Sequence, residues 1–225
     1  MMKRIACASF VVSLLAVAAP AAQVTGQVKI VGQGKRSPAR TVVYAEPLTG
    51  SAAARPGRFK LTQQNKSFVP RVLAVPAGST VDFPNLDPIF HNVFSMSRPG
   101  SFDLGLYRAG ASKSRVFSEP ATYRVFCNIH PQMTAVILVL PTSHIVQMDG
   151  GGSYRFELPP GRYRLTARSE RAQPATAEVT VADAAAAMPD LTLDESKYVE
   201  LPHKNKFGLD YSKTAYDPTR DALPK

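Results

Sequence analysis

Residues 121–140 read ATYRVFCNIHPQMTAVILVL, which is two strand-like runs separated by a short loop. The first six and the last seven residues of this stretch are rich in β-branched and aromatic side chains, which favour strands. Between these runs, Cys127, His130 and Met133 follow one another at steps of three. Such residues would face opposite sides within a strand, whereas a loop can turn them toward one point. The stretch therefore predicts two strands joined by a loop that carries possible metal ligands.

Similar short runs extend through most of the chain, and no stretch shows a helical period of any length. The 225 residues include 19 Pro and 14 Gly, which divide the chain into short segments. The remaining predicted strands of the first part are 24–30, 40–45, 59–63, 68–78, 80–83, 93–94 and 114–117. Short strands at this spacing predict an all-β protein built as a β-sandwich.

The first residues have the features of a secretory signal peptide. Lys3 and Arg4 precede an apolar run over residues 5–19, and small residues follow up to Ala22. This run is short for a membrane span, which needs about 20 residues, and no second apolar run follows. We therefore expect cleavage near Ala22, no transmembrane segment after cleavage, and export to the periplasm.

We expect four parts along the chain: a signal peptide (1–22), a first β domain (23–140), a smaller β unit (141–193) and a polar C-terminal tail (194–225). Pro141 ends the first series of strands. The second unit, of about 50 residues, is at the small end for an independent core, so it should dock on the first domain. The tail is predicted to be extended, packed on the protein or disordered.

The chain is basic, with 27 Lys and Arg against 17 Asp and Glu and a formal net charge of +10. Loss of Lys3 and Arg4 with the signal peptide would leave 25 basic and 17 acidic residues, a net charge of +8. The excess is spread along the chain and is densest between Arg162 and Arg171. It predicts either a solvated face or attraction to an acidic redox partner or an anionic surface. We expect no nucleic-acid partner for an exported protein.

Cys7 and Cys127 are the only cysteines, and Cys7 lies inside the predicted signal peptide. In an oxidising compartment, the remaining thiol is buried, paired between chains or bound to a metal. With His91, His130 and Met133 it forms a set of one thiolate, two imidazoles and one thioether, which suits copper with a weak axial Met. Zinc seldom uses a thioether. The alternative is that the Cys and Met are core residues and the His residues lie at the surface.

These motifs resemble the cupredoxins, and among them the plastocyanin and amicyanin branch. The residues that carry the resemblance are Phe83-Pro-Asn, His91-Asn92-Val93 and Cys127-x-x-His130-Pro131-x-Met133. The resemblance covers roughly residues 23–140 and implies a Greek-key β-sandwich with one type 1 copper site at one end.

The resemblance also implies a role for each matching residue. His91, Cys127 and His130 would be equatorial copper ligands, and Met133 would be the axial ligand. Asn92 would stiffen the site by hydrogen bonding. The edge of His130 would reach the surface and serve as the point where electrons enter and leave.

The segment 150–193 resembles, more weakly, the carboxypeptidase-regulatory and transthyretin-like β domains. The resemblance rests on Tyr154-x-Phe156-x-Leu158-Pro-Pro-Gly161 and the residues that follow. A cupredoxin followed by such a module is similar to exported proteins labelled "methylamine utilization protein".

We therefore expect a periplasmic type 1 copper protein that is not an enzyme and passes single electrons between redox partners. Two alternatives remain: a copper carrier that uses the same ligands with help from Met96 and Met148, and a structural β-module. His144 and His203 lack ligand-like neighbours and are interpreted as surface residues. Asp87 belongs to no carboxylate pattern that indicates a role.

Overall fold

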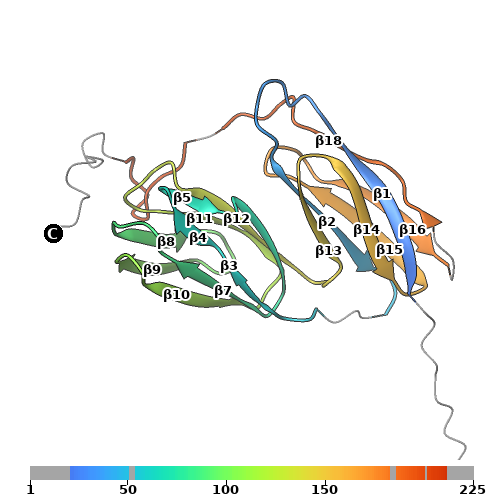
Figure 1. The fold of residues 1–225 in the computed structure, drawn as a ribbon, viewed down its shortest axis with the longest axis horizontal. Helices are drawn as coiled ribbons and strands as arrows, with labels where there is room; N and C mark the ends of the chain where they lie inside the picture. The colour runs from blue at the N-terminus through green and yellow to red at the C-terminus, as the bar shows by residue number, and fades with distance from the viewer. Residues whose placement is uncertain (1–20, 51–53, 183–185, 201, 212–225) are drawn as a thin grey trace, which may run out of the picture.

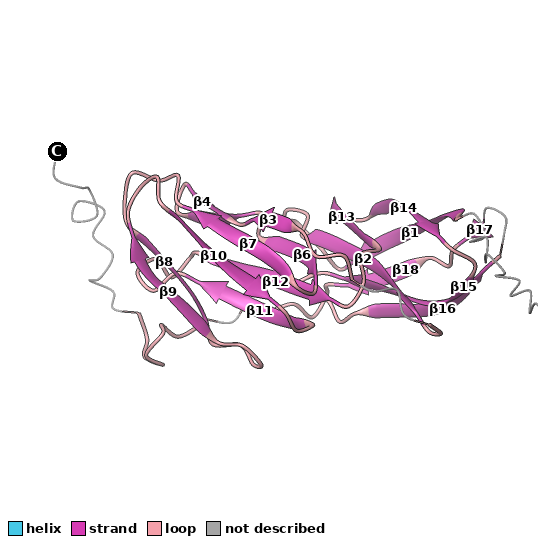
Figure 2. Cartoon of the chain, turned by 90° about the horizontal axis from the view of Figure 1, so that it is seen from below, coloured by secondary structure: helices cyan, strands magenta, loops and turns pink. Residues whose placement is uncertain are grey.

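The computed structural model describes residues 21–50, 54–182, 186–200 and 202–211, so the predicted signal peptide lies almost entirely outside the described residues. The described residues form strands and turns and contain no helix, which confirms the all-β prediction. Within those ranges no helix has the length and apolarity to span a membrane. The strands build two sandwiches that lie side by side along the long axis of the molecule (Figures 1 and 2).

The first sandwich is formed by residues 58–140. One sheet has the strand order β6-β12-β11-β8-β9, the facing sheet has the order β10-β7-β3, and β4 and β5 form a hairpin. β11 and β12 are consecutive, but their outer neighbours β8 and β6 come earlier in the chain, as in a Greek key. The strands are β3 (Arg58–Lys60), β4 (Thr62–Gln64), β5 (Ser67–Val69), β6 (Val72–Pro76), β7 (Ser79–Pro84), β8 (His91–Ser95), β9 (Phe102–Tyr107), β10 (Ser112–Phe117), β11 (Ala121–Phe126) and β12 (Thr134–Leu140).

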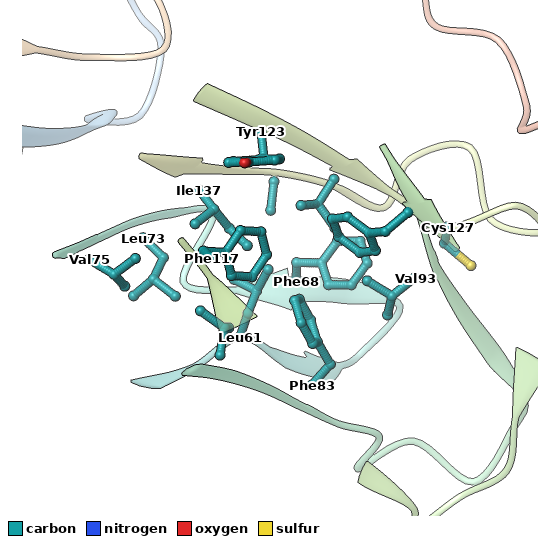
Figure 3. Packing of buried hydrophobic residues seen from close by; sticks show 14 of the residues in the cluster. Leu61, Phe68, Leu73, Val75, Phe83, Val93, Phe117, Tyr123, Cys127 and Ile137 are labelled. Carbon is teal, nitrogen blue, oxygen red and sulfur yellow. The ribbon is translucent and has the colours of Figure 1, made fainter. Parts of the chain in front are cut away.

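An aromatic and aliphatic core lies between these two sheets. The rings of Phe117 and Tyr123 meet edge to face, with 4.9 Å between their centroids. On β11, Tyr123 and Val125 point inward, and Cys127 continues the same alternation one step beyond the strand. Figure 3 shows Cys127 at one end of the core and Val75 at the other. Strand periodicity therefore directs the thiol inward at one end of the sandwich.

The second sandwich combines the N-terminal strands with strands from beyond residue 140. One sheet has the order β14-β1-β17 with β18 also paired to β1, and the facing sheet has the order β13-β2-β15-β16. The strands are β1 (Ala22–Val31), β2 (Arg40–Pro47), β13 (Ile145–Asp149), β14 (Gly152–Leu158), β15 (Gly161–Arg168), β16 (Ala175–Val181), β17 (Ala186–Ala187) and β18 (Leu191–Asp194).

This pairing differs from the predicted domain boundaries. β1 pairs antiparallel with β14, from Ala22 opposite Leu158 to Val28 opposite Gly152. β2 lies between β13 and β15. Residues 22–47 thus belong to the second sandwich, and the predicted first domain of 23–140 is too long at its N-terminal end. Alternating hydrophobicity predicts that a segment is a strand but contains no information on which distant strand it pairs with.

The two sandwiches meet through the other face of β2. Val42 and Tyr44 pack against β6 and β12 of the first sandwich, whereas Val43 faces the core of the second. The side chain of Gln147 accepts a hydrogen bond from the backbone N–H of Ala74 at 2.9 Å and donates to the Ala74 carbonyl at 3.3 Å. The second unit therefore docks on the first, as expected.

After β18 the chain leaves the second sandwich and returns to the first (Figure 1). Arg71, just before β6, forms ion pairs with Glu170 of the second sandwich at 2.8 Å and with Glu200 of the returning segment at 3.3 Å. This described part of the predicted tail is thus packed on the protein.

Candidate metal centre

Three predicted ligands come from adjacent strands at one end of the first sandwich. His91 is the first residue of β8, and Cys127 follows the last residue of β11, which is next to β8 in the sheet. His130 lies in the short loop between β11 and β12, here called the ligand loop (residues 127–133). The antiparallel pairing of Phe126 with Phe94 places the start of the loop beside β8.

The donor atoms of these three side chains converge. The Cys127 Sγ atom lies 3.7 Å from Nδ1 of His130 and 4.0 Å from Nδ1 of His91, and the two Nδ1 atoms are 3.0 Å apart. With metal–nitrogen distances of about 2.0 Å and metal–sulfur distances of about 2.3 Å, two donors of one ion lie roughly 3 to 4 Å apart. The spacing therefore fits a single small metal ion.

Met133, the predicted axial ligand, ends the ligand loop and is fully buried. Its backbone closes the loop, because its N–H donates to the His130 carbonyl at 3.0 Å and its carbonyl accepts from the Cys127 N–H at 3.2 Å. These bonds tie the two ends of the loop together. They place the thioether residue beside the ligands, and its axial role stays a prediction.

Asp87 holds the outer nitrogen of His91. Its Oδ2 atom lies 2.7 Å from Nε2 of His91, and both side chains are buried. Burial raises the pKa of Asp87, but hydrogen bonds from the Lys66 N–H, His91 and the Asn65 N–H outweigh burial and bring the pKa below its usual value. The carboxylate is therefore ionised at neutral pH and accepts a hydrogen bond from Nε2–H, which leaves the Nδ1 lone pair of His91 directed at the other donors.

The turn between β4 and β5 completes this arrangement. Asn65 and Lys66 have positive φ angles of 54° and 52°, which directs both of their N–H groups at the Asp87 carboxylate, at 2.6 and 2.8 Å. Consecutive N–H groups of this kind form a concave site for an anion. The hairpin thus fixes the carboxylate that orients His91.

Asn92 connects the strand of one ligand to the loop of another. Its Oδ1 atom accepts from the N–H of Asn128, the residue after Cys127, at 3.3 Å. Its Nδ2 atom donates to Asp103 at 2.7 Å. These contacts are of the kind expected from the predicted stiffening role.

The position of His130 differs from the prediction of a surface-exposed ring edge, because its exposed fraction is 0%. His203 also differs from its interpretation as an isolated surface residue, since it packs on Phe126 beside the ligand loop. Sequence reasoning also missed Asp87, for which the available indication was its spacing of four residues from His91. Sequence spacing alone does not distinguish such a carboxylate from a solvated one.

No protein-family model and no curated protein sequence matches the chain. A copper-containing nitrite reductase from Thermus scotoductus SA-01 is 28% identical over 42% of this chain and 25% of its own, with a TM-score of 0.36. A purple cupredoxin from Nitrosopumilus maritimus is 28% identical over 34% of this chain and 84% of its own, with a TM-score of 0.31. A copper(I) amicyanin variant is 21% identical over 43% of this chain and 99% of its own, with a TM-score of 0.35. The chain therefore spans about a quarter of the nitrite reductase.

Because these TM-scores are below 0.5, the fold is assigned from the strand order and from the positions of the ligands. Two facing sheets, a histidine at the start of β8 and a Cys-x-x-His loop after β11 meet at one end, as the motif resemblance predicts. The first sandwich has a cupredoxin fold. The likeness of the second sandwich to carboxypeptidase-regulatory domains stays a prediction.

The nitrite reductase contradicts one prediction. The chain was expected not to be an enzyme, but a structure similar to its cupredoxin domain is itself an enzyme. The inference from this fold to an absence of catalysis is therefore wrong, because cupredoxin domains also occur in enzymes.

Proposed function

We propose that the protein binds one copper ion in a type 1 site and transfers single electrons between redox partners. The observation that carries the proposal is the convergence of Sγ of Cys127 with Nδ1 of His91 and of His130, all within 4.8 Å of one another and fully buried. Thiolate ligands favour Cu(I) and imidazole accepts Cu(II), so copper bound here would supply one-electron chemistry.

The protein's contribution in this proposal is a rigid and dry site. Asp87 orients His91, the backbone bonds of Met133 close the ligand loop, and Asn92 ties this loop to β8. A site held in this way rearranges little when the metal changes its oxidation state. Burial of the donors excludes water, which would otherwise compete with them as a ligand of the metal.

The copper-carrier alternative is less well supported. Met96 follows the far end of β8 from His91 and is 62% exposed, and Met148 belongs to β13 of the second sandwich. Five residues of extended chain span about 16 Å, so Met96 is too far from His91 to bind the same ion. Neither methionine is placed to assist the proposed site.

We also propose export to the periplasm and an acidic redox partner. The support is the signal-like N-terminus and the net charge of +8, from 25 basic and 17 acidic residues, that would remain after cleavage. Arg162 and Arg164, in the densest basic stretch, both form ion pairs with Glu178, at 3.2 and 3.4 Å. We therefore attribute the attraction to an acidic partner to the overall charge of the protein rather than to this stretch. Electron transfer to an acidic partner should then slow as the ionic strength rises.

The test of the copper site is visible absorption and paramagnetic resonance of the purified protein during titration with Cu(II). We expect an intense thiolate-to-copper band at one copper per chain, absent in Cys127→Ser and lost or strongly shifted in His130→Gln. His144→Gln, at a histidine outside the cluster, is the matched control and should keep the band. Tight Cu(I) binding without a blue band would favour the carrier, and no copper binding would leave a structural module.

A further inference from the structure

The C-terminal segment 202–211 packs against the ligand loop from outside. The ring of His203 stacks on Phe126, with 4.1 Å between centroids and 25° between planes. Its Nε2 atom donates to the carbonyl of Pro131 at 2.7 Å. Phe126 precedes Cys127 and Pro131 follows His130, so His203 contacts the neighbours of two of the ligands.

Tyr211 reaches a ligand residue directly. Its hydroxyl donates to the carbonyl of Cys127 at 2.9 Å, while the N–H of Cys127 is already bound to the Met133 carbonyl. The peptide groups on both sides of the thiol are thereby fixed.

Lys206 closes a ring of hydrogen bonds with the residues that follow two of the ligands. Its N–H donates to Oδ1 of Asn128 at 3.0 Å, and its Nζ atom lies 2.7 Å from Oδ2 of Asp103. Asp103 in turn accepts from Asn92, and Asn92 accepts from the N–H of Asn128. Since Asn92 follows His91 and Asn128 follows Cys127, the segment is linked to both ligand-bearing strands.

These contacts are few and specific. A cavity of about 1060 Å³ lies beside them and is lined by Pro131, His203 and Tyr211 together with Arg71 and Glu170. The segment is thus one wall of a cavity rather than part of a continuous core. Single substitutions can therefore break its contacts with the loop and leave both sandwiches intact.

We propose that residues 203–211 form a clamp on the metal centre, in which Tyr211 and Lys206 are positioning residues. Tyr211 acts through the Cys127 carbonyl, and the Lys206 side chain acts through Asp103, which holds Asn92. The clamp holds the ligand loop closed over the thiol and slows exchange of the metal and entry of solvent. Its role in copper chemistry rests on the proposed function, but its closure of the Cys127 thiol does not.

The first test measures the rate at which a thiol reagent modifies the metal-free full chain. All variants are made in a Cys7→Ser background, so that Cys127 is the only thiol. Tyr211→Phe removes only the hydroxyl, and Tyr163→Phe is its matched control, because the hydroxyl of Tyr163 donates to the Pro159 carbonyl at 2.9 Å within the second sandwich. We expect modification to be several-fold faster in Tyr211→Phe and unchanged in Tyr163→Phe.

The second test uses the copper-loaded protein and adds Lys206→Met. Its control is Lys29→Met, since Lys29 pairs with Asp190 at 2.5 Å in the second sandwich, outside the clamp. We expect release of Cu(I) to a chelator about 10-fold faster in Tyr211→Phe and Lys206→Met, the range typical of residues behind metal ligands, with a shifted visible band. Both controls should match the wild type.

The outcomes separate the clamp from the copper proposal. Equal thiol reactivity in Tyr211→Phe and the unsubstituted protein, with unchanged copper release and spectrum, would overturn the clamp. A wild type without a blue band, in which Tyr211→Phe still speeds modification of Cys127, would retain the clamp and reject type 1 copper. Circular dichroism of each variant checks that the sandwiches remain folded.

Discussion

Oδ2 of Asp87 and Nε2 of His91 lie 2.7 Å apart, and both side chains are buried in the first sandwich. The bond sets which nitrogen of the ring carries the proton. It therefore also sets which nitrogen is available to a metal, and this is the one that faces Cys127. A carboxylate behind a histidine ligand makes the imidazole a stronger donor.

Replacing this carboxylate should weaken the site. In Asp87→Asn we expect Cu(II) affinity to fall about 10-fold, because the imidazole becomes a poorer donor. The reduction potential should rise, since Cu(II) benefits more from a basic ligand than Cu(I). Competition titration and redox titration measure the two effects. Asp190→Asn, at an exposed acid of the second sandwich, is the control, and unchanged values in Asp87→Asn would remove Asp87 from the site.

Met133→Leu tests the axial position. The side chain is fully buried, and Leu is of similar volume, so the fold should lose less than about 1.5 kcal/mol of stability. We expect most copper binding to persist and the reduction potential to shift, because a weak axial thioether tunes the potential more than it holds the metal. If neither the potential nor the affinity changes, the axial assignment to Met133 is wrong.

The stability of the first sandwich should depend on pH through Asp82. A hydrogen bond from Ser114 and an ion pair with Arg58 at 2.7 Å bring the pKa of Asp82 below its usual 3.8, although burial opposes this. Because the pKa is lower in the folded state, the ionised form stabilises the fold above about pH 4, and this contribution is lost as the pH falls further. Asp82→Asn should cost about 1 kcal/mol at neutral pH.

Urea unfolding at a series of pH values measures this difference. The gap between Asp82→Asn and the wild type should narrow as the pH falls below about 4. A gap that stays constant down to pH 2 would show that the charge of Asp82 does not stabilise the fold.

Gly26→Val tests the assignment of β1 to the second sandwich. Gly26 lies opposite Tyr154 in the β1–β14 pair, and a side chain at this position would collide with the Tyr154 ring. We expect a loss of about 1 to 3 kcal/mol, as for other overpacked sites, from a transition of the second sandwich. Thr25→Val, on the exposed face of β1, is the control. Loss of the blue band with an unchanged second sandwich would contradict the assignment.

Much of the candidate site can be predicted from a short stretch of sequence. The alternation of Tyr123 and Val125 predicts the inward face of β11, and the same period extends to Cys127. The steps of three to His130 and Met133 require a loop if the side chains are to converge. His91 is harder to place by such reasoning, since its contact with Cys127 depends on β8 and β11 being neighbours in the sheet.

Other features were decided only when the chain had folded. Three assignments depend on tertiary contacts. These contacts place Val24 and Val43 in the second core rather than the first. They also make Asp87 the partner of His91 rather than a solvated acid, and they place the end of Tyr211 on Cys127 rather than in solvent. The local pattern determined the strands and the ligand loop by itself, because strand periodicity and chain geometry act over a few residues. Strand pairing and the clamp follow from the burial of whole faces, which only the tertiary structure brings together.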